Sequence, residues 1–221
     1  MKNLATYIDH TLLKQDASAS AIITLCEEAK THGFASVCIQ PHYIPLAAKE
    51  LEGSSVLVCT VIGFPLGQNT TEIKVQETKL AIAQGAQEID MVINLSWVKA
   101  RKDEVLIQEI AAIKAACGSH ILKVILETSM LSPEDIVYAC KISQKAGANF
   151  VKTSTGFANG GATVDAVRLM KQTVGDALEV KASGGIRDLA TMEAMIAAGA
   201  TRIGTSSGIA ILAGQKASGS Y

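Results

Sequence analysis

The chain has 221 residues, of which 48% are hydrophobic and 19% are charged, and its formal net charge is -1. This balance gives no electrostatic reason to expect nucleic acid or an anionic membrane as a partner, and aromatic residues, at 4%, are too few for base-stacking surfaces. No apolar run approaches the ~20 residues of a membrane span, and MKNLATYIDH lacks the apolar core of a signal peptide. A cytoplasmic protein with one sizeable core is therefore expected.

Short β-branched runs alternate with longer segments of helical period along the whole chain. Strands are predicted at 4–9, 35–39, 56–62, 87–93, 120–126, 149–153, 177–182 and 201–205. Helices are predicted at 18–31, 70–84, 98–116, 132–146, 161–174 and 188–198, with a further short helix near 206–213. Stretches such as THGF and KAGANF place a glycine where a helix end favours positive φ, and Ser132-Pro133-Glu134 supplies a helix start.

Eight strands that alternate with helices, without a linker or a shift in composition, predict a parallel (β/α)8 barrel, or TIM barrel. We expect this single domain to cover residues 1–213. The alternative is a doubly wound open sheet, which usually carries G-x-G-x-x-G after its first strand. Here DHTLLK follows the first strand, so the barrel is favoured. Residues 214–221, GQKASGSY, are small and polar and predict a flexible C-terminal tail.

Three charged residues lie late in, or inside, otherwise apolar strands. Because side chains alternate along a strand, Lys152 shares a face with Phe150, and Asp90 shares a face with Val92. In a barrel, the carboxyl ends of the strands form the mouth that carries the catalytic residues. Lys152 and Lys181 belong to consecutive strands, so both are expected to project into this mouth.

A lysine next to a second lysine and an apolar wall has a chemical use. A nearby like charge and partial desolvation both depress an ammonium pKa, and lowering it from ~10.4 to ~7 takes about 4 kcal/mol. The neutral amine is then a nucleophile toward carbonyl groups, which we predict for Lys152. Lys123, in ILKVILET, is the alternative nucleophile, although its deeper position also suits an interior charge paired with a carboxylate. A charged residue at the barrel rim, without a catalytic role, is the remaining interpretation.

Two glycine-rich turns follow the last two predicted strands, SGGIR at 183–187 and GTSSG at 204–208. Backbone amides in such turns approach an anion closely, and the loops after strands seven and eight are the usual phosphate site of this barrel. The four histidines have no metal-binding spacing, so neither a metal nor another cofactor is expected. The five cysteines form no CxxC pair and are expected to be buried free thiols, Cys38 in SVCIQP among them.

The motifs VKTSTGF, VKASGGIR, EIDMVIN, IDHTLL and RIGTSSG closely resemble the strand-end motifs of the 2-deoxyribose-5-phosphate aldolase family. The resemblance implies a class I aldolase on a TIM barrel, commonly a homodimer. Its reaction would be the reversible cleavage of 2-deoxy-D-ribose 5-phosphate to acetaldehyde and D-glyceraldehyde 3-phosphate, in deoxynucleoside catabolism. It implies that Lys152 forms the Schiff base, that Lys181 lowers the pKa of Lys152, and that Asp90 handles protons.

The resemblance also implies a set of substrate and phosphate positions. These are Gly184, Gly185, Gly204, Ser206, Ser207 and Thr155. Some members of the family carry a lysine directly after STG, where this chain has Phe157, so phosphate dependence is expected to be weaker here. Tyr221 is expected to fold back over the imine and relay a proton, as in many members. Cys38 is expected to overlook the mouth and to add to an enal formed from acetaldehyde.

Two other functions stay open from the residues. One is a different lysine-dependent barrel aldolase, acting on a longer ketose or on a keto acid; a keto acid would require a further cation beyond Lys181. The other is a non-catalytic protein that binds a sugar phosphate, for which two converging lysines beside an aspartate have no evident use. The substrate in every case is a small molecule.

Overall fold

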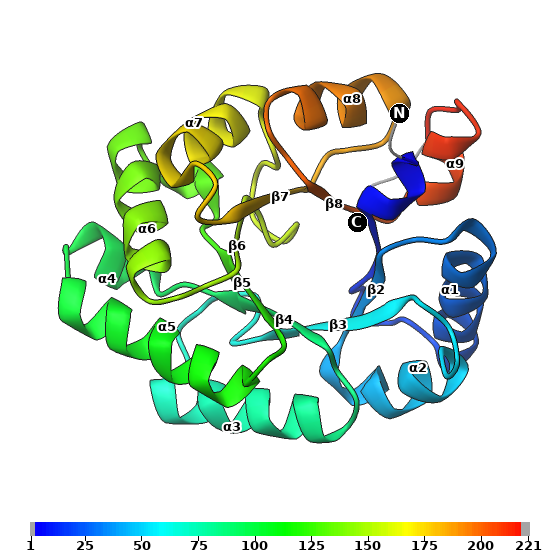
Figure 1. Ribbon diagram of the computed structural model, residues 1–221, viewed down its shortest axis with the longest axis horizontal. Helices are drawn as coiled ribbons and strands as arrows, with labels where there is room; N and C mark the ends of the chain where they lie inside the picture. Colours follow the sequence, from blue (N-terminus) through cyan, green and yellow to red (C-terminus); the bar gives the residue numbers. More distant parts are fainter. Residues whose placement is uncertain (1–2, 218–221) are drawn as a thin grey trace.

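A computed structural model describes residues 3–217 of the chain. Within this range the strands form one closed parallel barrel in the order β1 to β8, which confirms the predicted fold. Their bounds are β1 Ile8–Leu12, β2 Ser36–Ile39, β3 Leu57–Ile62, β4 Glu88–Val92, β5 Ile121–Ile125, β6 Phe150–Lys152, β7 Glu179–Ser183 and β8 Arg202–Thr205. Figure 1 shows the strands at the centre of a ring of helices.

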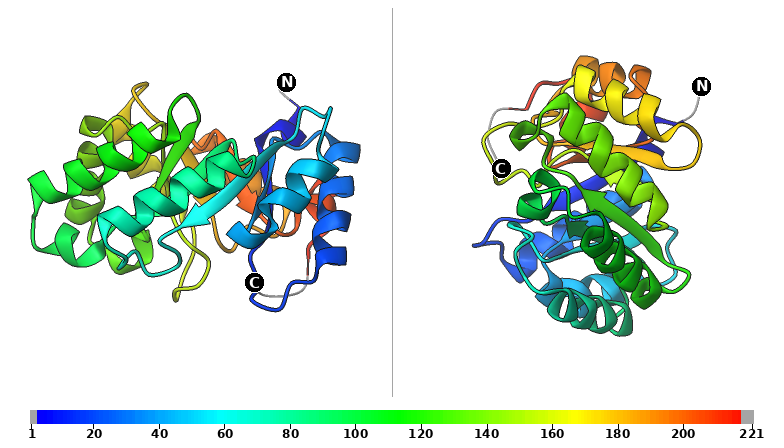
Figure 2. Two further views of the ribbon diagram at one scale, coloured as in Figure 1. Left: turned by 90° about the horizontal axis from the view of Figure 1, so that it is seen from below. Right: turned by 90° about the vertical axis from the view of Figure 1, so that its left-hand side faces the viewer.

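The helices of the described residues surround the barrel, and Figure 2 shows this ring from two further sides. They are α1 Ala19–His32, α2 Ile44–Glu50, α3 Thr71–Ala83, α4 Leu95–Lys99, α5 Asp103–Cys117, α6 Pro133–Lys145, α7 Val164–Val174, α8 Leu189–Ala197 and α9 Gly208–Leu212. Three short 3-10 helices, η1 Leu4–Tyr7, η2 Pro41–Tyr43 and η3 Thr128–Met130, complete the elements. None of the helices in residues 3–217 has the length and apolar character to cross a membrane.

The helix boundaries follow the capping signals of the sequence. At the start of α6, Ser132 accepts a hydrogen bond from the backbone N–H of Asp135, and the Asp135 side chain bonds back to Ser132, with Pro133 at the first helical position. After α1, Gly33 adopts the left-handed conformation at φ 66°, as a helix end of this kind requires. Local side-chain chemistry therefore fixes where these helices begin and end.

Two of the predicted elements are wrong in their bounds. The predicted strand 4–9 is a 3-10 helix at Leu4–Tyr7, because the Asn3 side chain accepts a hydrogen bond from Ala5 N and starts a turn. The first strand begins only at Ile8. The predicted helix 161–174 begins only at Val164, where the Thr163 side chain caps it by accepting from Ala166 N.

The predicted single helix 98–116 is also wrong, since it is two helices. Helix α4 starts earlier, because Asn94 accepts hydrogen bonds from Ser96 N and Trp97 N. The chain then turns at Arg101, which has a positive φ of 53°, and α5 begins at Asp103. Helix α2 was not predicted, because a segment of seven residues shows too few periods for the pattern to register.

The strands separate two kinds of interior. Their outward side chains pack under the helices in one continuous apolar core that includes Ile89, Leu122 and Val180. Inside the barrel, Cys38 and Cys59 belong to a small apolar cluster on the β1–β3 side. The inner face also carries fully buried charged side chains, among them Asp90, Lys123 and Lys181. All five cysteines are free and buried, as predicted.

A buried ion pair ties α3 to α5, which lie side by side in Figure 1. Lys74 Nζ lies 2.8 Å from Glu109 Oε1, and neither side chain is exposed. Lys74 also donates to Val92 O at the end of β4, at 3.1 Å. Burial lowers the pKa of Lys74, and Glu109 opposes that shift. The pair thus anchors both helices to the end of a strand that carries Asp90.

Glu109→Ala is expected to lower the free energy of unfolding by about 3–5 kcal/mol, because it leaves a buried ammonium group without its counter-charge. Urea unfolding followed by circular dichroism measures the change. Glu104→Ala, at an exposed position of the same helix, is the matched control and should change the free energy by less than about 0.5 kcal/mol. Similar losses in both variants would contradict the assignment.

Candidate functional site

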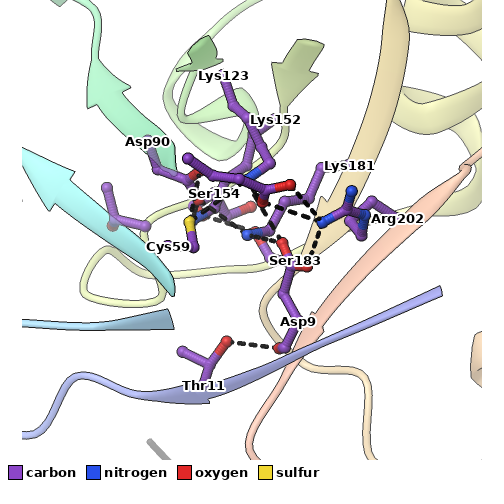
Figure 3. A network of polar contacts seen from close by, with 12 residues as sticks. Asp9, Thr11, Cys59, Asp90, Lys123, Lys152, Ser154, Lys181, Ser183 and Arg202 are labelled. Carbon is purple, nitrogen blue, oxygen red and sulfur yellow. Dashed lines mark hydrogen bonds and ion pairs between the residues drawn. The ribbon is translucent and has the colours of Figure 1, made fainter. Parts of the chain in front are cut away.

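Asp90 is the centre of the charged interior, and three lysines from three consecutive strands converge on its carboxylate (Figure 3). Lys152 Nζ and Lys181 Nζ both lie 2.8 Å from Asp90 Oδ2. Lys123 Nζ lies 2.9 Å from Asp90 Oδ1. Strand alternation therefore predicted correctly that Asp90, Lys152 and Lys181 face one space. The structure adds that the carboxylate lies between the two lysines.

The charges around Asp90 determine its protonation state. Burial by itself raises the pKa of Asp90, but Lys123, Lys152 and Lys181 outweigh burial and hold the pKa well below its usual range. Burial lowers the pKa of Lys181, yet Asp9 and Asp90 outweigh it and keep the pKa well above the ordinary value. Asp90 is therefore an anion and Lys181 a cation at neutral pH.

Lys152 and Lys123 lie at different depths in the barrel. In the β5–β6 register Lys152 is paired with Ile125, two residues beyond Lys123 toward the carboxyl ends of the strands. Lys152 is 2% exposed, whereas Lys123 is not exposed at all. Lys123 Nζ lies 2.5 Å from Glu88 Oε2 in addition to its contact with Asp90. Lys123 is thus the paired interior charge, and Lys152 is nearer the mouth.

The base of the cluster contains three residues that the sequence did not single out. Arg202 Nη1 lies 2.7 Å from Asp9 Oδ1 and 3.0 Å from Glu88 Oε2, and Lys181 Nζ lies 2.5 Å from Asp9 Oδ2. A signal was available, since Glu88 precedes Asp90 by two residues on the same strand face. Asp9, in IDHTLL, and Arg202, two residues before Gly204, follow the same alternation.

The glycine-rich turns after β7 and β8 are neighbours at the mouth, because Ser183 pairs with Gly204. Gly184 and Gly185 have positive φ of 84° and 79°, and Gly185 is exposed. Gly204 has a different structural role. A Cβ there would lie 2.8 Å from Ser183 Cβ and 3.0 Å from Lys181 Cε, so this glycine makes room for Lys181.

The serines of the second turn follow β8 directly. Ser206 is exposed and Ser207 is half-buried, and Ser207 N donates to Thr205 Oγ1 at 2.9 Å. Gly185, Ser206 and Ser207 are therefore accessible at the mouth, whereas Gly204 lies within the barrel wall.

Thr155 is held by a buried carboxylate in the loop after β6. The Thr155 hydroxyl donates to Glu127 Oε2, and its backbone N–H donates to the same oxygen at 3.2 Å. Glu127 itself adopts a left-handed conformation at φ 55°. Phe157 N donates to Thr155 Oγ1 at 3.0 Å, which continues the same chain of contacts. Contacts between Glu127, which follows β5, and Thr155, which follows β6, thus fix the loop after Lys152.

Phe157 lies between two hollows of the barrel mouth. It is 40% exposed, and its ring meets that of Phe64 edge-on, with 5.2 Å between centroids. On one side a cavity of about 340 Å³ is lined mainly by apolar residues that include Leu66 and Met130. On the other side a more polar hollow of about 480 Å³ is shared with Lys14, Gln15 and Asp16.

Cys38 lies inside the barrel and is fully buried. It is paired in register with Cys59, and a hydrogen bond with that thiol lowers the pKa of Cys38. Tyr221 lies outside the described residues. The roles expected for Cys38 and Tyr221 stay predictions.

Among residues 3–217, two sets of three donor atoms lie within 4.8 Å of one another and could hold a metal ion: Cys38, Cys59 and Asp90, and Asp9, Cys59 and Glu88. The carboxylates of both sets are already paired with ammonium groups. Asp90 contacts Lys123, and Asp9 contacts Lys181. A cation would have to displace these lysines, so neither set fits a metal well.

Comparison with known proteins assigns the chain to a family, because residues 3–214 match the model of the DeoC/LacD family aldolases. The chain belongs to this family. It is 56% identical to the deoxyribose-phosphate aldolase of Brevibacillus brevis over 218 residues, which cover 99% of each chain. It is also 56% identical to the enzyme of the same name from Streptococcus gordonii, again over 99% of each chain.

Solved structures of the DeoC/LacD family agree with this assignment. A putative deoxyribose-phosphate aldolase from Coccidioides immitis superposes with a TM-score of 0.94 at 44% identity, covering 96% of this chain and 85% of the other. The tetrameric deoxyribose phosphate aldolase of Aeropyrum pernix gives a TM-score of 0.87 at 34% identity, covering 95% and 89%. Both likenesses extend over the whole barrel.

Proposed function

We propose that the chain is a class I aldolase that reversibly cleaves 2-deoxy-D-ribose 5-phosphate to acetaldehyde and D-glyceraldehyde 3-phosphate. The observation that carries this proposal is the position of Lys152. It is the lysine of the cluster nearest the mouth, and its ammonium group contacts one carboxylate, Asp90 Oδ2, at 2.8 Å. The names of the bacterial relatives support the same reaction.

The proposed chemistry uses Lys152 as a neutral amine. It attacks the open-chain aldehyde, and loss of water leaves an iminium that accepts the electron pair of the breaking C–C bond. Asp90 lies within hydrogen-bond distance of Lys152 Nζ and is the group we assign to general acid and base steps. Lys181, bonded to the same oxygen of Asp90, supplies the like charge beside the nucleophile. The distances among the three residues support these proposed roles.

The phosphate end of the substrate is assigned to the turns after β7 and β8. Backbone amides around Gly184 and Gly185, with the hydroxyls of Ser206 and Ser207, would bind the phosphate oxygens. Gly204 contributes by leaving room for Lys181. Thr155, bonded to Glu127, is assigned to the sugar portion nearer Lys152.

The test is an assay of acetaldehyde release from 2-deoxy-D-ribose 5-phosphate, combined with borohydride reduction in the presence of acetaldehyde. We expect turnover and a reduced adduct on Lys152, located by peptide mass analysis. An adduct on Lys123 alone would overturn the assignment of the nucleophile. Binding of the sugar phosphate without turnover or adduct would favour a non-catalytic binding protein.

Phe157→Lys is expected to lower the KM for 2-deoxy-D-ribose 5-phosphate by about tenfold, because a charge-assisted contact to phosphate is worth about 1.5–3 kcal/mol before ordering costs. The new ammonium group would enter the hollow that already contains Lys14. The measurement compares KM for phosphorylated and unphosphorylated deoxyribose. An equal change for both sugars would show that position 157 does not act on the phosphate.

A cytoplasmic homodimer is the proposed setting of this activity. The Aeropyrum pernix relative is tetrameric, so a tetramer is the alternative assembly. Ile73 and Leu80 are exposed on one stripe of α3, at 50% and 60%, and exposed apolar residues of this kind suit an interface. Light scattering of the purified protein determines which state this chain adopts.

A further inference from the structure

The base of the barrel interior contains a carboxylate and a guanidinium group that the proposed reaction does not use. Glu88 and Arg202 face each other there, with Arg202 Nη1 at 3.1 Å and 3.0 Å from the two carboxylate oxygens of Glu88. Glu88 is fully buried, and the Arg202 side chain is 12% exposed. Neither residue contacts Lys152 in the described structure. Their effect on it must be electrostatic.

The interior charges form one connected network, seen in Figure 3. It has three carboxylates and four cationic groups: Asp9, Glu88 and Asp90 against Lys123, Lys152, Lys181 and Arg202. Charges in a low-dielectric interior are costly unless they balance. The network is therefore neutral when one of its lysines has lost its proton.

The lysines of the network differ in how many carboxylates they contact. Lys123 lies within 4.0 Å of three carboxylates, Asp9, Glu88 and Asp90, at 3.7, 2.5 and 2.9 Å. Lys181 contacts two, at 2.5 and 2.8 Å. Lys152 contacts only Asp90 among the described residues. Arg202 does not deprotonate in proteins. Lys152 is thus the lysine of the network with the fewest carboxylate partners.

Two further side chains that donate to the carboxylates of the network come from β2 and β3. Ser36 donates to Asp9 Oδ1 at 2.7 Å, and Cys59 Sγ donates to Asp90 Oδ1 at 3.2 Å. Burial keeps the pKa of Cys59 well above its ordinary value, so this thiol is neutral. Cys38 faces the same space beside Cys59. The formal charge of the interior is thus set by the seven ionic side chains.

We propose that Glu88 and Arg202 are positioning residues that set the charge balance in which Lys152 is a neutral amine. Arg202 acts through Asp9, and Glu88 acts through Lys123, which also contacts Asp90. Neither touches substrate, and the inference rests on the proposed role of Lys152. Without Arg202, three carboxylates face only Lys123 and Lys181, and Lys152 must keep its proton. Without Glu88, two carboxylates face three cations, and Lys152 loses its proton more easily.

The test measures the rate of borohydride trapping by acetaldehyde at Lys152 as a function of pH. Arg202→Met is expected to move the midpoint of this profile up by about one pH unit, and Glu88→Gln to move it down by a similar amount. The double variant restores the balance and should return the midpoint to within about 0.3 units of the wild type. Arg202→Lys keeps the charge and is the matched control.

Opposite shifts with recovery in the double variant distinguish charge balance from a structural role, which would slow trapping in all variants without moving the midpoint. Shifts of the same sign, or none, would overturn the proposal. If Arg202→Met does not fold by circular dichroism, Glu88→Gln and the double variant decide by the same criterion. Repeating the profiles in a Cys38→Ala background excludes that thiol as their source. If the wild type forms no adduct at Lys152, the proposed function itself fails.

Discussion

Lys152→Met is expected to lower turnover of 2-deoxy-D-ribose 5-phosphate by at least about 10⁴-fold and to abolish borohydride trapping. The substitution removes the nucleophile, and we expect no other lysine of the described cluster to replace it. Lys123 lies two residues deeper in register, and Lys181 is bound to both Asp9 and Asp90. The kinetic assay and the peptide mass analysis are performed on the same preparation.

The fold should tolerate this change. Asp90 keeps Lys123 and Lys181 as counter-charges at 2.9 and 2.8 Å, so no buried carboxylate is left unpaired. We expect the free energy of unfolding to change by less than about 1 kcal/mol. Lys79→Met, at an exposed position of α3, is the control with the same chemical change. Residual turnover within tenfold of the wild type would refute the catalytic assignment.

Asp90→Asn is expected to damage both activity and stability. The buried ammonium groups of Lys123 and Lys181 lose the charge of their common partner, which should lower the free energy of unfolding by about 3–5 kcal/mol. Loss of the group assigned to proton transfer should lower turnover by at least about 10³-fold. Asp165→Asn, whose side chain is 93% exposed, is the matched control and should be neutral in both measurements.

The stability loss in Asp90→Asn has a pH signature. The pKa of Asp90 is depressed in the folded protein by its three lysines, against the effect of burial. A depressed carboxyl contributes stability that is complete above its unfolded pKa, near 3.8, and is lost as the pH falls through the folded value. The difference between wild type and variant should therefore be constant from pH 5 to 7 and shrink below about pH 3.8. A difference that does not depend on pH would contradict the ionic origin of the effect.

The sequence was sufficient for the barrel and for part of its site. Alternation of short apolar runs with helical segments predicted the closed barrel, because each strand must be covered by a helix. Alternation within strands brought Lys152, Lys181 and Asp90 to the same interior, and the structure confirms that convergence. These inferences needed only contacts that are local in the chain or between consecutive strands.

What the sequence could not predict is which side chains pair inside the closed barrel. The contact of Arg202 with Asp9 joins residues that are 193 positions apart, and alternation places both in the interior without showing that they form an ion pair. The break at Arg101 is similar, since its φ of 53° is unusual for this residue type. Side-chain hydrogen bonds of Asn3 and Asn94 place two element boundaries away from their predicted positions. In each case competing local chemistry or long-range packing decided the outcome.

The contact between β1 and β8 also has a consequence for the order of folding. Asp9 receives its Arg202 partner only when the last strand docks against the first, so a partly closed barrel would have to bury carboxylates without all their cations. Such an intermediate is unfavourable if its interior is dry, because the unpaired carboxylates then lose their hydration without gaining a counter-charge. Closure of the barrel and drying of its centre should therefore occur as one cooperative event, late in folding, with the reactive amine assembled in the same step.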